Sequence, residues 1–139
     1  MLPTDQPPFI WRVRVYWEDT DAGGVVYHAS YVRFFERART EWLRSLGTDQ
    51  ARMHREQGVV FVVYAMDLRF LRPARMDDEL DVGVALHRCR AAGLDLHQNL
   101  TRVADAIQIA TAQVKVACVD ASNFQPVRIP SALFAENDG

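Results

Sequence analysis

Acidic residues, two adjacent glycines and one histidine lie close together between residues 18 and 31. Asp21 precedes Gly23 and Gly24, and His28 follows them. A carboxylate can act as a nucleophile or general base toward an activated carbonyl, and the unpaired amides of a helix start can bind the oxyanion that forms. This stretch is therefore predicted to carry hydrolytic chemistry, with glycines that permit the tight turn needed to bring carboxylate and amides to one carbonyl.

Two other interpretations of this stretch use the same residues. Asp21 alone is typical of a turn aspartate that accepts hydrogen bonds from its own loop. Asp19, Asp21 and Gly24 also match the beginning of a calcium-binding loop, but Ser30 occupies the position where a bidentate glutamate is needed. We therefore expect no metal ion here, and we expect Glu18 and Asp19 at most to support Asp21.

The segments on both sides of this stretch predict the elements that position it. Apolar residues at every second position of residues 9–17 predict a strand. Aromatic and aliphatic residues then recur at three- and four-residue steps, which predicts an amphipathic helix that begins near residues 28–30. Ser30 is its predicted N-cap and Gly47 its predicted terminator, and a shorter helix is expected over residues 48–57.

Four further strands are expected in the second half of the chain, over residues 59–72, 79–88, 94–102 and 107–120. Their short links make them antiparallel neighbours, and a change of phase between Ile109 and Val114 predicts either a bulge or burial on both faces of the strand. One strand, one strongly apolar helix and four more strands bury their apolar faces together only if the sheet wraps the helix. We therefore predict an α+β protein with the hotdog fold, a curved antiparallel β-sheet wrapped around a long central α-helix, in a single domain over residues 1–139.

The composition excludes several classes of function. The chain has 139 residues, 49% of them hydrophobic, which suits one globular domain. A formal net charge of -2 argues against nucleic acid as a partner. No apolar run approaches the roughly 20 residues of a membrane-spanning helix. Residues 1–8 lack the basic and apolar segments of a secretion signal, so we expect a cytoplasmic protein. Cys89 and Cys118 are isolated and are expected to be buried thiols.

Residues 18–31 and three further segments resemble the 4-hydroxybenzoyl-CoA thioesterase family, in particular its Tol-Pal-associated acyl-CoA thioesterases. The further segments are residues 32–41 (VRFFERARTE), 61–63 (FVV) and 73–78 (PARMDD), so the resemblance covers most of the chain. It implies hydrolysis of an acyl-CoA thioester to a free acid and coenzyme A. No cofactor and no metal are implied, because coenzyme A is part of the substrate.

The resemblance also implies roles for four residues. Asp21 is implied to be the catalytic carboxylate, acting either as the nucleophile or as the general base for a water, a choice that the sequence leaves open. The backbone N–H of His28 is implied to donate to the thioester oxygen, and the His28 side chain to assist. Tyr27 and Ser30 are implied to line the substrate pocket, which lies between the subunits of a dimer in such enzymes.

A function from another class stays open at this point, namely a non-catalytic hotdog module that binds acyl carrier protein or envelope-assembly partners. Acyl carrier protein also stays open as the carrier of the acyl group. Large apolar residues such as Trp42, Tyr64 and Phe70 predict a homodimer or homotetramer. His87 and His97 are expected to form an exposed cross-strand pair rather than half of a zinc site. The candidates for binding coenzyme A phosphates are Arg69, Arg72, Arg75, Arg88 and Arg90.

Overall fold

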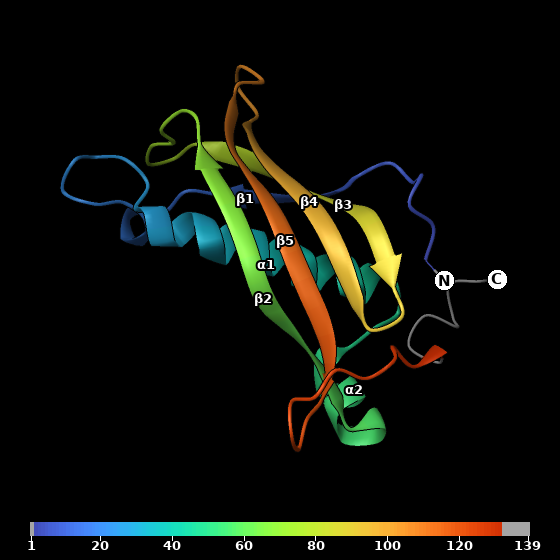
Figure 1. Ribbon diagram of the computed structural model, residues 1–139. Helices are drawn as coiled ribbons and strands as arrows, with labels where there is room; N and C mark the ends of the chain where they lie inside the picture. Colours follow the sequence, from blue (N-terminus) through green and yellow to red (C-terminus); the bar gives the residue numbers. More distant parts are fainter. Residues whose placement is uncertain (1, 132–139) are drawn as a thin grey trace.

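A curved, antiparallel five-stranded sheet wraps one long helix in the computed structural model, which describes residues 2–131 (Figure 1). The sheet has the order β1-β3-β4-β5-β2. Its strands are β1 (Phe9–Arg14), β2 (Val59–Phe70), β3 (Glu79–Arg90), β4 (Gly93–Arg102) and β5 (Gln108–Asp120). The helices are α1 (His28–Ser45) and α2 (Gln50–Gln57), and a short 3-10 turn, η1, spans Trp17–Asp19. The predicted hotdog fold is confirmed.

The long helix α1 is buried along the side that faces the sheet. Tyr31, Phe34, Phe35 and Ala38 are each no more than 4% exposed, as their three- and four-residue spacing predicts. Trp42 is also buried in this core, so it does not contribute to the apolar surface from which an oligomer was predicted.

The predicted N-cap of α1 is wrong, whereas its predicted end is confirmed. Ser30 lies inside the first turn, and Tyr27 occupies the cap position without a capping side-chain hydrogen bond. The chain enters the helix earlier because the Tyr27 N–H donates to the Asp19 carbonyl oxygen (2.8 Å) and fixes the extended backbone there. Gly47 ends the helix with a φ of 85°, the left-handed conformation that glycine adopts without strain.

Strand β1 is shorter than predicted, because the chain turns at Val15. The N–H of Val15 donates to the Asp78 carbonyl oxygen (2.9 Å), and the Val15 carbonyl oxygen accepts from Asp77 (3.0 Å). Trp17 therefore leaves the sheet and is 76% exposed, contrary to the predicted strand pattern. The predicted bulge is confirmed at Ile109, where the pairing of β4 with β5 changes register.

The remaining predicted elements are confirmed with small shifts of their ends. Asp49 caps α2 by accepting hydrogen bonds from the backbone N–H groups of Ala51 and Arg52. Cys118 is buried as predicted, whereas Cys89 is only half-buried. No helix among residues 2–131 is long and apolar enough to cross a membrane.

Asp95 gives the sheet a pH-dependent contribution to stability. Arg90 donates a hydrogen bond to its carboxylate at 2.8 Å and lowers the pKa of Asp95. Because the folded pKa is below the unfolded value of about 3.9, the pair stabilises the protein above about pH 4, and this stabilisation is lost as pH falls through the folded pKa. We expect Asp95→Asn to lower Tm by about 3 °C at pH 7. Thermal unfolding of both proteins at pH 7 and pH 3 should show the difference shrinking in acid; a difference independent of pH would contradict this.

Candidate active site

The loop between β1 and α1 is a short hairpin fixed by its own backbone. Thr20 and Val26 form an antiparallel bridge, and the Asp21 N–H donates to the Val25 carbonyl oxygen at 3.0 Å. Asp19 anchors the base of the hairpin, because its buried carboxylate accepts from the Tyr16 N–H at 2.8 Å. This bond gives Asp19 a structural role and turns its carboxylate toward the backbone, which does not favour the calcium-loop interpretation.

Asp21 stands where this hairpin turns, with one carboxylate oxygen engaged in the turn. Its Oδ1 accepts from the Gly23 N–H at 2.8 Å, and its carbonyl oxygen accepts from the Gly24 N–H at 3.0 Å. Gly24 has a φ of 78°, which favours glycine at this position. The Asp21 side chain is exposed, and its Oδ2 accepts no hydrogen bond from residues 2–131. The structure therefore holds the carboxylate by one oxygen and leaves the other available.

The start of α1 offers unpaired amides beside two rings. Within the described residues, the N–H groups of His28 and Ala29 donate to no carbonyl oxygen, whereas the Ser30 N–H bonds the Tyr27 carbonyl oxygen at 2.8 Å. The rings of Tyr27 and His28 lie 4.3 Å apart between centroids, and both side chains are exposed. Unpaired amides at a helix start carry partial positive charge and can bind an oxyanion.

The four predicted site residues are only partly brought together. Tyr27 and His28 are neighbours at the start of α1. Asp21 lies in the loop that precedes α1 and projects beyond the N-terminal end of this helix (Figure 1). Ser30 is 1% exposed, and its Oγ has no hydrogen-bond partner among residues 2–131. A ligand reaching Asp21 and the start of α1 would therefore contact Tyr27 and His28 directly and find Ser30 beneath the surface.

A second loop, residues 73–78, supports the hairpin, a structural role that the sequence did not predict. The Val26 N–H donates to the Ala74 carbonyl oxygen at 2.8 Å, and the Ala74 N–H donates to the hydroxyl oxygen of Tyr31 at 3.0 Å. Burial raises the pKa of this Tyr31 hydroxyl, which therefore stays neutral. The PARMDD motif marked this segment, but only the fold shows that it connects the hairpin to α1.

Arg102 holds the second loop in place, and its removal should destabilise the protein. The guanidinium donates to the Pro73 carbonyl oxygen at 2.7 Å and to the Asp78 carboxylate at 3.1 Å. We expect Arg102→Ala to lower the free energy of unfolding by about 2 kcal/mol, since it removes several charged hydrogen bonds. Urea unfolding measures this loss, and Arg12→Ala, which breaks an exposed ion pair with Asp81, is the matched control with a smaller effect. Equal losses in both variants would contradict a special role for Arg102.

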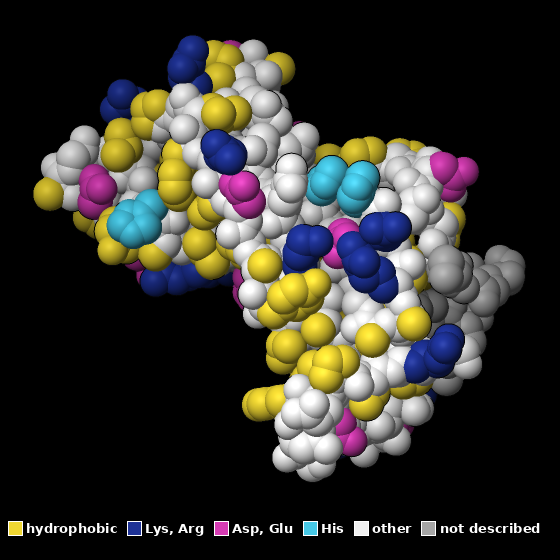
Figure 2. All heavy atoms as spheres, viewed as in Figure 1, with side chains coloured by type: hydrophobic (Ala, Val, Ile, Leu, Met, Phe, Trp, Pro, Cys, Tyr) yellow, Lys and Arg dark blue, Asp and Glu magenta, His cyan; other side chains and the backbone are white. Residues whose placement is uncertain are grey.

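Of the other candidate residues, Arg75 lies beside this loop, where it pairs with Val25 in an isolated antiparallel bridge. His87 and His97 stack with ring centroids 4.2 Å apart, in agreement with the expected cross-strand pair. Figure 2 shows these two adjacent histidines beside a group of basic side chains. Among residues 2–131, no three His, Cys, Asp or Glu side chains are grouped to hold a metal. Of the five phosphate-binding candidates, Arg69 pairs with Asp67 and Arg90 with Asp95.

Sequence and structure comparisons agree on one class of relatives. The Thioesterase-like superfamily matches residues 15–136. The acyl-CoA thioesterase YbgC of Haemophilus influenzae is 44% identical over 127 residues, which cover 91% of this chain and 92% of that protein. The acyl-CoA thioester hydrolase YbgC of Escherichia coli O157:H7 is 44% identical over 92% of this chain and 94% of its own length. The crystal structure of a probable thioesterase from Bartonella henselae has a TM-score of 0.78 and 34% identity, covering 90% of this chain and all (100%) of that chain.

Proposed function

This chain belongs to the thioesterase-like superfamily and is an acyl-CoA thioester hydrolase, and we propose that its reaction depends on Asp21 and on the backbone N–H of His28. The observation that carries the proposal is the half-engaged carboxylate of Asp21. The Gly23 N–H donates to Oδ1 and fixes the orientation of the carboxylate, while Oδ2 accepts no hydrogen bond from residues 2–131. A carboxylate held in this way is suited to attack a thioester or to remove a proton from water.

The start of α1 supplies the second requirement of the reaction. As the thioester carbonyl is attacked, negative charge develops on its oxygen, and the unpaired N–H of His28 can donate to it. Losing one such donor costs about 3 kcal/mol of transition-state stabilisation in acyl-transfer enzymes. Tyr27 and the imidazole of His28 would then contact the substrate beside the reacting carbonyl, and no prosthetic group takes part.

We further propose that the complete site forms between two copies of the chain. Strand β2 is an edge strand of twelve residues whose outer backbone groups pair with no other strand among residues 2–131. Hydrophobic side chains gather along this edge in Figure 2, and Tyr64 and Phe70 are 60% and 53% exposed. Pairing through β2 would cover these side chains and bring the loop of one chain toward α1 of the other, in a homodimer or in a tetramer of two such pairs.

Thiol release tests the proposed function directly. The purified chain, incubated with short, long and aromatic acyl-CoA substrates, should release coenzyme A from at least one of them, as measured with a thiol reagent. Sedimentation equilibrium should give a dimer or tetramer mass. A chain that binds acyl-CoA or acyl carrier protein tightly and releases no thiol would instead be the non-catalytic binding module, and the proposed role of Asp21 would be wrong.

A further inference from the structure

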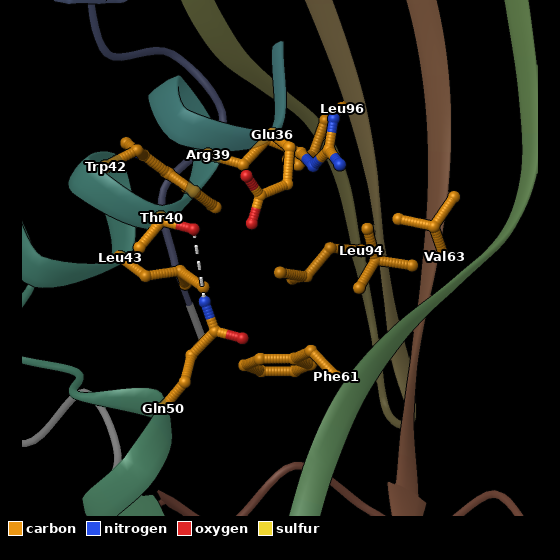
Figure 3. Close-up of a pocket in the computed structure, with 11 residues that line it drawn as sticks. Glu36, Arg39, Thr40, Trp42, Leu43, Gln50, Phe61, Val63, Leu94 and Leu96 are labelled. Atoms are coloured by element: carbon orange, nitrogen blue, oxygen red, sulfur yellow. Dashed lines mark hydrogen bonds between the residues drawn. The ribbon is translucent and has the colours of Figure 1, made fainter. Parts of the chain in front are cut away.

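A cavity of about 150 Å³ lies between the second half of α1 and the inner face of the sheet (Figure 3). Its apolar wall comes from β2, β4 and β5, and its polar side comes from α1 and α2. A cavity of this volume is large enough for one small organic ligand, about the size of a six-carbon chain. The wall residues are Phe61, Val63, Leu94, Leu96 and Val116, and the polar ones are Glu36, Arg39, Thr40 and Gln50.

The guanidinium of Arg39 is the unusual group in this cavity. Its Nη1 donates to Gln98 Oε1 at 3.0 Å, and Gln98, only 3% exposed, is held in turn by donating to the Phe35 carbonyl oxygen at 3.0 Å. This chain of hydrogen bonds fixes the guanidinium through one of its nitrogens. The Nε and Nη2 groups make no hydrogen bond to residues 2–131, so donors remain for a ligand.

Arg39 also differs from Arg102, another largely covered arginine, in its distance from carboxylates. Within residues 2–131, no carboxylate oxygen lies within 4.0 Å of its guanidinium, whereas Arg102 has two such partners although its side chain is likewise largely covered. Burial lowers the pKa of Arg39, and Glu36 acts in the opposite direction from a greater distance. An arginine still stays charged at neutral pH, and a charge removed from water is stabilised by an anion that matches its planar fork.

We propose that this cavity binds a carboxylate carried on a short aliphatic chain, with the carboxylate on Arg39 and the chain against Phe61, Leu94 and Leu96. Two sources supply this chemistry. One is a free carboxylic acid such as the product of hydrolysis, and the other is an acyl-CoA whose acyl group ends in a second carboxylate, a case that rests on the proposed function. Arg39 lies eleven residues beyond His28, about 16.5 Å along the helix, so in the second source both the Asp21 and the His28 N–H that act on the thioester belong to a partner chain.

The charge of Glu36 gives the proposal a distinctive test. Figure 3 shows the Glu36 carboxylate pointing into the cavity from the same helix as Arg39. Its negative charge opposes a bound carboxylate, so Glu36→Gln should bind hexanoate several-fold more tightly, while Arg39→Gln should bind it at least tenfold more weakly. If the true ligand instead donates a hydroxyl hydrogen bond to the Glu36 carboxylate, Glu36→Gln should bind it more weakly, and this result would contradict a carboxylate ligand.

Calorimetric titration of hexanoate into the otherwise unmodified chain measures this binding directly, because a free carboxylate has no thioester bond to hydrolyse. Arg37→Gln is the matched control, because Arg37 is exposed on the same helix and does not line the cavity. Arg39→Lys keeps the positive charge and loses the planar pair of donors of the guanidinium, so it should bind hexanoate with an affinity between those of the unmodified chain and Arg39→Gln. This variant also serves as a control for a folding defect in Arg39→Gln. Equal binding of hexanol and hexanoate, or hexanoate binding that is unchanged in Arg39→Gln, overturns the proposal.

Hydrolysis of two thioesters of equal chain length distinguishes the two sources. If the substrate carries the carboxylate, Arg39→Gln should lower kcat/KM for adipoyl-CoA at least tenfold and leave hexanoyl-CoA unchanged. If the ligand is the free acid, Arg39→Gln should weaken hexanoate binding and leave the ratio of the two kcat/KM values as it is. Hexanoate binding by a chain that hydrolyses no thioester would refute the proposed function and support the free acid as the ligand.

Discussion

Asp21→Asn should give a folded protein that hydrolyses acyl-CoA about a thousandfold more slowly than the unmodified chain. The asparagine side-chain oxygen can still accept from the Gly23 N–H, so the turn that now holds Oδ1 at 2.8 Å should survive. The substitution removes the charge and the basicity of the second oxygen, and asparagine can neither attack a thioester nor take a proton from water. Thiol release with saturating acyl-CoA measures the loss in kcat.

The matched control for this experiment is Glu18→Gln. Glu18 is an exposed acid three residues earlier in the same loop, and it makes no hydrogen bond within residues 2–131. Its replacement should leave kcat within about twofold of the original value, because it removes the same charge without touching the hairpin turn. If Asp21→Asn kept the full rate over a broad range of acyl chains, the carboxylate of residue 21 would have no catalytic role.

Phe35→Ala should lower the free energy of unfolding by about 3–5 kcal/mol, a large part of the total for a domain of this size. Phe35 is 0% exposed and belongs to the core between α1 and the sheet, so removing its ring loses buried apolar area and leaves a cavity that the surrounding structure fills only in part. Its carbonyl oxygen also accepts from the buried Gln98 side chain at 3.0 Å. Urea unfolding followed by circular dichroism measures the change.

Val32→Ala is the control for this substitution. Val32 lies on the same helix and is 39% exposed, so truncating it should change the free energy of unfolding by less than about 0.5 kcal/mol. A loss below about 1 kcal/mol for Phe35→Ala would contradict the packing of α1 against the sheet.

The sequence alone was sufficient to predict elements whose signal is local and periodic. Helix α1 was predicted from the spacing of Tyr31, Phe34 and Phe35, because each helical turn returns to the same face. The bulge at Ile109 followed from a change of the two-residue strand period. The ends of elements were less predictable: Trp17 continues the strand alternation, yet backbone bonds from residues 77 and 78 turn the chain at Val15.

The same distinction between local and tertiary information applies to the candidate site. A carboxylate, two glycines and a helix start in sequence order made hydrolytic chemistry available in this stretch, and the resemblance to the thioesterase family assigned it to Asp21 as a prediction. Only the tertiary structure decided that Asp21 keeps one free oxygen, that Ser30 is buried, and that Ala74 and Arg102 hold the hairpin. It also decided that Arg39 faces a cavity and that, among residues 2–131, no carboxylate oxygen lies within 4.0 Å of its guanidinium. These features depend on contacts between residues far apart in the chain, and a local sequence pattern does not contain the distance between such residues.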